Sequence, residues 1–308
     1  MHSVIFPGQG SQIVGMAKEF YHNFNYVKDY FSTANEILKK NLSRIILEGP
    51  KDLLDKTENT QPAIFLVSYV IFKVIEKETN FKIMNAKYFA GHSLGEYSAL
   101  CCSNSINFEQ TINLLKDRGT AMQNAVPNNE GGMTAVLGTN IDVINEILEE
   151  KNKISCYVAN DNSNGQIVVS GMMQSLELFE NELIKQKIKF VKLQVSAPFH
   201  SPLMSKATEE MKQKIHNTNF KNPQIDVISN VTAKPVNDFS KIKNLLIEQI
   251  EKPVRWRESI NNMIELGIDN FVEVGPGKVL SGLIKRINRN VKVNNINTLE
   301  EVLNLTND

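Results

Sequence analysis

The chain has 308 residues, of which 42% are hydrophobic and 22% charged, a composition typical of a globular protein with a substantial buried core. Lys and Arg number 34 together, as do Asp and Glu, so no net field draws the chain to nucleic acid or to an anionic membrane. The three cysteines, Cys101, Cys102 and Cys156, form no CxxC pair, which argues against a disulfide framework or a zinc site.

No targeting or membrane segment is recognisable in the sequence. The N-terminus leads directly into an apolar run at residues 4–6, without the basic and long apolar regions of a signal peptide. The most apolar stretch, residues 63–72, is too short to span a bilayer and is typical of a buried helix. We therefore expect a cytoplasmic protein.

In the first 125 residues, short apolar runs at 4–6 and 88–90 are predicted strands, each ending at glycine. Helical patterns cover residues 61–78 and 108–125. After residue 195 the same alternation returns, with predicted strands at 227–229 and 271–274 and predicted helices at 202–217, 242–250, 257–266 and 279–287. This alternation favours a large α/β domain, formed by residues 1–125 and 195–308, in which a mostly parallel sheet carries helices on both faces.

The middle of the chain follows another order. Strands are predicted at residues 133–137, 154–159, 166–170 and 190–195, and helices at 143–150 and 176–186. The resulting β-α-β-β-α-β order is the ferredoxin-like arrangement. We interpret residues 126–194 as a small ferredoxin-like subdomain inserted into the large domain, and the junction between the two as a favoured position for a ligand cleft.

A candidate nucleophile lies between a predicted strand and a predicted helix. Residues 91–95 read Gly-His-Ser-Leu-Gly, a G-x-S-x-G match, and strand, tight turn and helix are what a nucleophile elbow of the α/β-hydrolase type requires. Ser93 could instead cap the helix, but its context favours catalysis, with the N–H of Leu94 directed at a developing oxyanion. Glu96 in the first helical turn is explained by the helix dipole, and we assign it a structural role.

A serine hydroxyl needs a base, and the chain has five histidines. His2, His22 and His216 lie in unsuitable positions, and His92 flanks the nucleophile but points elsewhere. His200 remains, on a loop where the insert returns to the large domain and where Ser201 and Pro202 begin a helix. No acidic residue stands out as the group that would orient this histidine.

One charged side chain is out of place on an apolar helix face. Arg118 has Leu114, Leu115, Ala121 and Met122 as its helical neighbours, so we expect it to be buried. A buried guanidinium needs an anion. It either forms an internal salt bridge or holds a substrate carboxylate, for which the geometry of arginine is suited.

Taken together, these motifs resemble those of the malonyl-CoA:acyl-carrier-protein transacylases of bacterial fatty-acid synthesis, within the acyltransferase domain family, and the resemblance covers essentially the whole chain. The matching segments are residues 6–12, 60–63, 91–97, 118–119 with 122–123, 197–201 with 203–204, 229–232, 249 with 253–256, and 273–280. In this order and spacing they are highly specific.

The resemblance implies that Ser93 carries the acyl group as an ester, that His200 is the general base, and that Gln249 orients His200 through its backbone carbonyl. It also implies an oxyanion hole from Gln9 and the Leu94 N–H, and a malonyl carboxylate held by Arg118. Phe199 beside His200, and Leu94 after the serine, follow the malonyl-selective pattern. His92 and Gln61 are further candidates for substrate binding.

The resemblance further implies malonyl-CoA and acyl carrier protein as partners, ping-pong transfer, and no metal or other cofactor, since coenzyme A is a substrate. We expect a monomer. The elbow alone also fits a serine esterase or thioesterase, a non-catalytic carrier-binding module is a third hypothesis, and the same chemistry could serve a polyketide synthase. A basic cluster at Lys285, Arg286 and Arg289 is predicted either to dock an acidic carrier near the site or to be a solvated helix end.

Overall fold

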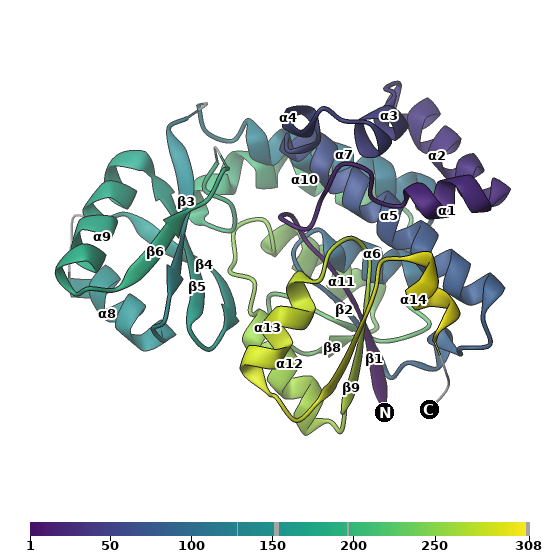
Figure 1. The fold of residues 1–308 in the computed structure, drawn as a ribbon. Coiled ribbons are helices and arrows are strands. Elements are labelled where there is room, and N and C mark those ends of the chain that lie inside the picture. Colours follow the sequence, from purple (N-terminus) through teal and green to yellow (C-terminus); the bar gives the residue numbers. More distant parts are fainter. Residues whose placement is uncertain (128, 151–153, 196, 306–308) are drawn as a thin grey trace.

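Two sheets organise the chain in the computed structural model, which describes residues 1–127, 129–150, 154–195 and 197–305 (Figure 1). The larger sheet has the strand order β10-β9-β1-β2-β7-β8, with parallel pairing except between β7 and β8. Its strands are β1 (His2–Phe6), β2 (Tyr88–Gly91), β7 (Val227–Ile228), β8 (Pro235–Val236), β9 (Asn270–Val274) and β10 (Lys292–Ile296).

Helices cover both faces of this sheet, which explains why its central strands are apolar without alternation. In β1, Val4 and Phe6 pack into the main core with α5 (Thr57–Glu78), α6 (Gly95–Cys102) and α7 (Phe108–Gln123). Ile5 points to the opposite face, where it joins a second core with α12 (Trp256–Glu265) and α13 (Val279–Ile287). Successive side chains of a strand face opposite ways, so a strand buried on both sides is apolar throughout.

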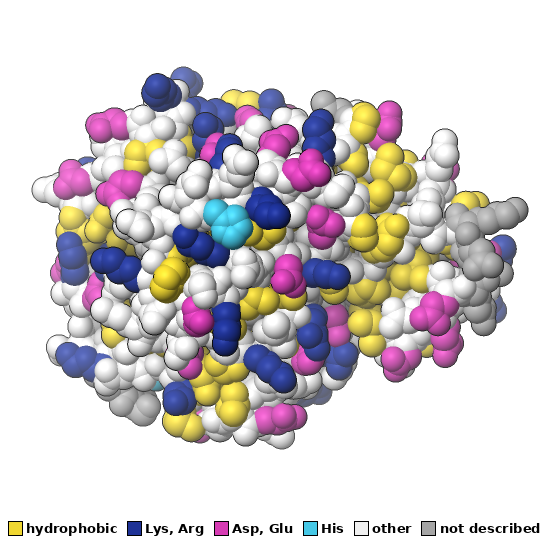
Figure 2. Space-filling model, turned by 180° about the vertical axis from the view of Figure 1, so that it is seen from behind, with side chains coloured by type: hydrophobic (Ala, Val, Ile, Leu, Met, Phe, Trp, Pro, Cys, Tyr) yellow, Lys and Arg dark blue, Asp and Glu magenta, His cyan; other side chains and the backbone are white. Residues whose placement is uncertain are grey.

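The remaining helices of the large domain surround this three-layer centre. They are α1 (Lys18–Asn23), α2 (Asn25–Leu38), α3 (Leu42–Leu47), α4 (Lys51–Leu54), α10 (Ser205–Asn217), α11 (Phe239–Glu248) and α14 (Leu299–Leu303), with short 3-10 turns at Ile83–Asn85 and Pro202–Met204. None of the described helices is long and apolar enough to cross a membrane. On the face seen in Figure 2, Lys and Arg side chains are interspersed with Asp and Glu, in keeping with the balanced net charge.

The second sheet has the ferredoxin-like order β4-β5-β3-β6 and is antiparallel. Its elements are β3 (Gly131–Leu137), α8 (Ile141–Glu150), β4 (Cys156–Ser163), β5 (Gln166–Met172), α9 (Met173–Lys185) and β6 (Lys189–Lys192). One face packs on α8 and α9 through a core of its own, whereas Met133, Ala135 and Val168 contribute to the main core. The expected β-α-β-β-α-β order is confirmed, and the boundaries at residues 126 and 194 stay a prediction.

A short ladder joins the second sheet to the large domain. The amide of Asp161 in β4 donates to the carbonyl of Val254 at 3.0 Å, and the amide of Val254 donates to the carbonyl of Ala159 at 2.9 Å. The guanidinium of Arg257 holds the carboxylate of Asp161 in a bidentate pair, with Nη2 2.8 Å from Oδ2. Because Asn162, next to Asp161, contacts His92 beside Ser93 at 2.8 Å, this junction lies close to the candidate site.

The structure corrects several expected boundaries. Helix α5 begins at Thr57, not at residue 61, and Pro62 lies inside it. The first turn is held by the side chain of Thr60, which donates to the carbonyls of Leu54 and Lys56. A 3-10 turn at Pro202–Met204 precedes α10, so the predicted helix at residue 202 starts as a tighter turn. Helices α1 to α4 and α14, and strands β8 and β10, were not predicted from the sequence.

Candidate active site

The candidate nucleophile lies in a sharp turn between β2 and α6. Ser93 has a φ of 52°, in the left-handed region that side chains rarely adopt. A Cβ on Gly91 would lie 1.9 Å from the carbonyl oxygen of Gly95, and one on Gly95 would lie 2.3 Å from the carbonyl oxygen of Phe6. Both flanking positions therefore require glycine: at position 91 the turn folds back on its own backbone, and at position 95 it packs directly against β1.

Replacing Gly91 with alanine is expected to lower the free energy of unfolding by about 3 kcal/mol, since the added methyl group overlaps backbone that cannot rotate away. Gly282, in the interior of α13, is the matched control, because a Cβ there meets nothing within 4 Å. Gly282→Ala should stabilise the protein by about 0.5–1 kcal/mol. Urea denaturation measures both, and similar effects of the two substitutions would contradict the steric account.

The structure brings Ser93 and His200 together. Ser93 Oγ lies 2.8 Å from His200 Nε2, and His200 Nδ1 lies 2.8 Å from the backbone carbonyl oxygen of Gln249. A carbonyl only accepts, so Nδ1 carries the proton and Nε2 is left free to accept the serine proton. The histidine is thus oriented as a general base by a backbone group in place of an acid.

The electrostatic surroundings keep this base neutral. His200 is only 4% exposed, and its pKa is lowered from 6.5 to about 3, first by burial and then by the positive charge of Arg118. The hydrogen bond to the Gln249 carbonyl opposes this shift only in part. Near neutral pH the imidazole is therefore unprotonated and able to accept a proton from Ser93.

Arg118 lies beside the nucleophile and is 1% exposed, as its helical neighbours predict. Its Nη1 donates to Gln61 Oε1 at 2.8 Å, and its Nη2 lies 2.8 Å from Gln249 Oε1 and 3.2 Å from Ser93 Oγ. Its Nε has no hydrogen-bond partner among the described residues, and no carboxylate in the same residues lies within salt-bridge distance. The guanidinium is thus buried with neutral partners, which leaves it able to bind an anion.

Two residues were expected to stabilise an oxyanion. Leu94 follows Ser93 with helical dihedral angles (φ −56°, ψ −27°) at the start of α6. Gln9 lies on the loop after β1, and this loop packs against the elbow, because a Cβ on Gly8 would lie 2.6 Å from the carbonyl oxygen of His92. The side-chain amide of Gln9 points to Thr57 Oγ1 at 3.5 Å, so its role in the oxyanion hole stays a prediction.

The other expected substrate-binding residues occupy different surroundings. Gln61 is buried and binds Arg118, so it supports the anion anchor. Phe199 is buried beside His200, and its carbonyl accepts a hydrogen bond from Ser170 Oγ at 2.5 Å. His92 pairs through Nε2 with Asn162 Oδ1 at 2.8 Å and packs against the ring of Trp256.

Asn230 was not recognised as a site residue from the sequence, although it belongs to a matching segment. Its Oδ1 accepts from the backbone N of Ser93 at 2.7 Å, and its Nδ2 donates to the carbonyl of Gly91 at 2.7 Å. It follows β7, the parallel strand next to β2. Its position at the carboxyl end of that strand is the sequence feature that could have indicated a site residue. Asn230 therefore braces the elbow at its first glycine and at the nucleophile itself.

The expectation that the basic cluster docks the carrier near the site stays a prediction. Lys285, Arg286 and Arg289 lie at or just beyond the end of α13, directly before β10, whereas the elbow follows the carboxyl end of β2. Since β2, β1, β9 and β10 are parallel, the cluster leads into the amino end of β10, whereas the elbow follows a carboxyl end. Two members have partners: Lys285 Nζ donates to the carbonyl of Val291, and Arg286 Nη1 donates to Gln166 Oε1 of β5, each at 2.6 Å.

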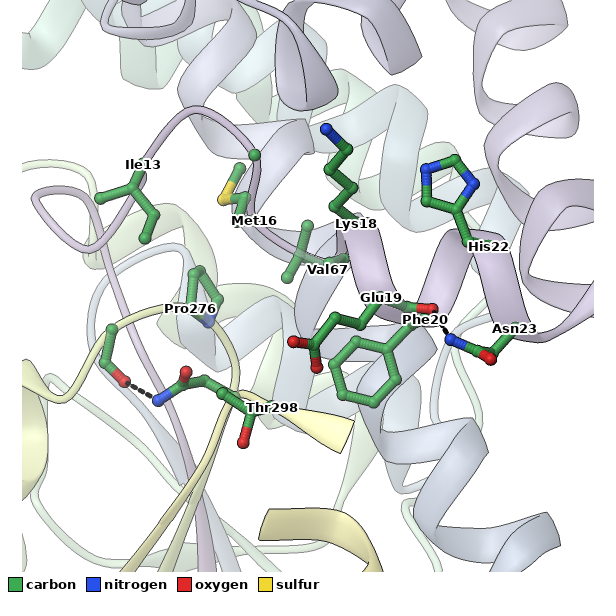
Figure 3. A pocket seen from close by; sticks show the side chains of 14 residues that line it. Ile13, Met16, Lys18, Glu19, Phe20, His22, Asn23, Val67, Pro276 and Thr298 are labelled. Atoms are coloured by element: carbon green, nitrogen blue, oxygen red, sulfur yellow. Dashed lines mark hydrogen bonds between the residues drawn. The ribbon is translucent and has the colours of Figure 1, made fainter. Parts of the chain in front are cut away.

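Two pockets open near the carboxyl ends of the strands. One, of about 550 Å³, is lined by the loop after β1, by α1 and α5, and by the loops after β9 and β10, with Met16, Val67 and Pro276 among its side chains (Figure 3). It contains neither Ser93 nor His200. The other, of about 520 Å³, has Gln9, Thr57 and Val195 among its lining residues, and its lining also contains neither Ser93 nor His200.

Comparison with known proteins agrees with this geometry. The model of the family described as "Acyl transferase domain" matches residues 4–302. Malonyl CoA-acyl carrier protein transacylase of Bacillus subtilis is 42% identical over 294 residues, which is 94% of this chain and 90% of the relative. Among solved structures, acyl-carrier-protein-S-malonyltransferase from Bartonella henselae has a TM-score of 0.94 at 39% identity and covers 98% of this chain and 96% of its own.

A second solved structure has the same TM-score of 0.94, at 34% identity, and covers 98% of this chain and 97% of its own. It is a malonyl-transacylase in complex with its type II PKS acyl-carrier protein. The likeness to these proteins extends over nearly the whole chain and includes the strand, turn and helix that hold Ser93. The chain belongs to the acyl transferase domain family.

Proposed function

We propose that the protein transfers a malonyl group from malonyl-CoA to the phosphopantetheine thiol of acyl carrier protein, as a step of fatty-acid biosynthesis. The observation that carries this proposal is the position of Arg118, whose Nη2 lies 3.2 Å from the Ser93 hydroxyl oxygen. An acyl group attached to Ser93 and ending in a carboxylate would meet a buried cation that has no carboxylate partner among the described residues. The names of the relatives support the same activity.

In the first half-reaction, His200 Nε2 takes the proton of Ser93 while Oγ attacks the thioester carbonyl of malonyl-CoA. Gln9 and the Leu94 N–H would stabilise the tetrahedral oxyanion, each donor contributing about 10²–10³ in rate. Collapse of this intermediate breaks the C–S bond, and the coenzyme A thiol leaves with the proton from His200. In the second half-reaction the carrier thiol gives its proton to His200 and attacks the ester carbonyl. Collapse breaks the C–O bond to Ser93, whose Oγ takes the proton back from His200, and the malonyl group leaves as a thioester of the carrier.

This chemistry uses a serine, a histidine and an arginine, so the proposal includes no metal or other cofactor. Within the described residues, no three His, Cys, Asp or Glu side chains are grouped as a metal site requires. The proposal also places the protein in the cytoplasm as a monomer, where malonyl-CoA and the carrier protein are its partners.

A role in polyketide synthesis is the second candidate, favoured by the likeness to the malonyl-transacylase bound to a type II PKS acyl-carrier protein. The chemistry at Ser93 would be the same, and only the carrier would differ. Comparing transfer rates to a fatty-acid carrier and to a polyketide carrier distinguishes the two roles.

The proposed function is tested by mixing the protein with malonyl-CoA, without carrier, and measuring its intact mass. We expect one malonyl adduct per chain, located by fragmentation at Ser93, which persists until carrier protein is added and then moves to it. Steady release of malonate without a stable adduct would identify a thioesterase. Absence of both adduct and turnover would contradict malonyl transfer.

A further inference from the structure

One buried carboxyl group close to the nucleophile takes no part in the chemistry described above. Glu96 lies in the first turn of α6 and is only 3% exposed. Its Oε2 accepts from the side-chain amide of Gln249 at 2.7 Å and from the backbone N of Asn230 at 3.1 Å. An acidic residue in a first turn is favoured by the helix dipole, but that effect does not require burial or contact with Gln249.

The side chain of Gln249 lies between Glu96 and Arg118. Its Oε1 accepts from Arg118 Nη2 at 2.8 Å, while its Nε2 donates to Glu96 Oε2 and approaches the carbonyl oxygen of Ser93 at 3.1 Å. Only this orientation of the amide is satisfied. A flipped amide would place its NH₂ group against the guanidinium and its oxygen against the carboxyl oxygen of Glu96, which gives a clash of donors at one end and of acceptors at the other.

The orientation of this amide bears directly on the reacting groups. Arg118 Nη2, which binds Gln249 Oε1, is also the nitrogen that lies 3.2 Å from Ser93 Oγ. The backbone carbonyl of Gln249 holds His200. A side chain that fixes the Gln249 amide therefore fixes where the guanidinium meets an acyl group on Ser93.

We propose that Glu96 is a positioning residue for malonyl transfer, which acts through the amide of Gln249 to hold Arg118 where it binds the malonyl carboxylate. This inference rests on the function proposed above. It assigns the role to the acceptor oxygen of Glu96 and not to a negative charge. In support, burial raises the pKa of Glu96 to about 7, despite the hydrogen bonds from Asn230 and Gln249, and one oxygen can accept whether or not the group is protonated.

Two substitutions separate the oxygen from the charge. Glu96→Gln keeps an acceptor oxygen at the same distance along the side chain, whereas Glu96→Met keeps the length and removes the acceptor. Acylation of the enzyme is measured with malonyl-CoA and with acetyl-CoA, whose acyl group has no carboxylate for Arg118 to hold. We expect Glu96→Met to lower kcat/KM for malonyl-CoA by about 30–100-fold, because misplaced binding groups cost up to about 100-fold. The loss for acetyl-CoA should be smaller than the loss for malonyl-CoA by a factor of at least ~5.

Glu96→Gln should stay within about threefold of the native protein for both substrates, because the hydrogen bond persists. Glu180→Met is the matched control. Glu180 lies on α9, is 5% exposed, and accepts from Thr134 Oγ1 and Lys192 Nζ of the second sheet, each at 2.8 Å. Its replacement should leave the malonyl-to-acetyl ratio unchanged. An unchanged ratio in Glu96→Met, or an equal loss in Glu96→Gln, would overturn the proposal.

A second variant keeps the test decisive if Glu96→Met does not fold. Gln249→Met removes the linking amide but retains the backbone carbonyl that holds His200, so it should reduce the malonyl-to-acetyl ratio as Glu96→Met does. In the double variant the ratio should fall no further, since both changes break one link. If the double variant reduced the ratio by the product of the two single effects, or if Gln249→Met kept the native ratio, the proposed action of Glu96 through Gln249 would be rejected. If the native protein itself formed no malonyl-enzyme, the proposed function would be wrong, which is a distinct result from a native adduct with unchanged ratios in the variants.

Discussion

Ser93→Ala is expected to abolish the malonyl-enzyme and to lower malonyl transfer by about 10⁴-fold or more, because loss of the nucleophile costs about 10⁶ in rate in a serine protease. The hydroxyl is held by His200 Nε2 at 2.8 Å and by Arg118 Nη2 at 3.2 Å, and no other described hydroxyl is placed between these two groups. Steady-state transfer to the carrier measures the loss, and intact mass after incubation with malonyl-CoA shows whether the ester forms.

Ser98 provides the control, since it lies on α6, the helix that follows the elbow, is fully buried, and has a hydroxyl without a hydrogen-bond partner among the described residues. Ser98→Ala should leave transfer within about twofold of the native rate. Adding His200→Ala to Ser93→Ala should cause no further loss, because the base has no role once the hydroxyl is gone. A persistent adduct in Ser93→Ala would place the nucleophile elsewhere.

The nucleophile and its base were predictable because local chemistry restricts the sequence around them. The elbow needs glycine at positions 91 and 95 for steric reasons that the structure makes explicit, so the motif directly reflects backbone packing. His200 could be singled out because so few histidines were available. The α/β alternation and the ferredoxin-like order were readable for a similar reason, since helices and strands of that length leave clear periodic patterns.

The groups that act through the backbone or through long-range contacts were not predictable from residue patterns. Gln249 orients His200 with its carbonyl oxygen, a group that every residue type has, and only the family resemblance indicated it. Glu96 was assigned a structural role because the helix dipole explains an acid in a first turn, and its contact with Gln249, 153 residues away, leaves no local pattern. Strand β10 was missed because its sequence, Lys-Val-Asn-Asn-Ile, is that of a half-exposed edge strand, with only Ile296 buried.

Arg118→Ala is expected to lower kcat/KM for malonyl-CoA by about 10²–10³-fold, since charge-assisted hydrogen bonds to a carboxylate are the strong ones and two can form at once. The value of kcat/KM for acetyl-CoA, which lacks the carboxylate, should fall by no more than about tenfold. This smaller loss reflects the contact of Arg118 Nη2 with Ser93 Oγ. Acylation rates with the two substrates, measured by intact mass against time, give the ratio that decides between an anchor and a structural arginine.

An equal loss with both substrates would identify Arg118 as structural, and stability measurements sharpen this distinction. Removing the guanidinium leaves Gln61 Oε1 and Gln249 Oε1 without their donor in a buried site, so Arg118→Ala should also cost about 2 kcal/mol of unfolding free energy. Glu180→Met, which also removes a buried charged group, serves as the control for stability alone. Only an anchor predicts that the malonyl-to-acetyl ratio falls in Arg118→Ala while it stays at the native value in Glu180→Met, because a general loss of stability affects both acyl groups alike.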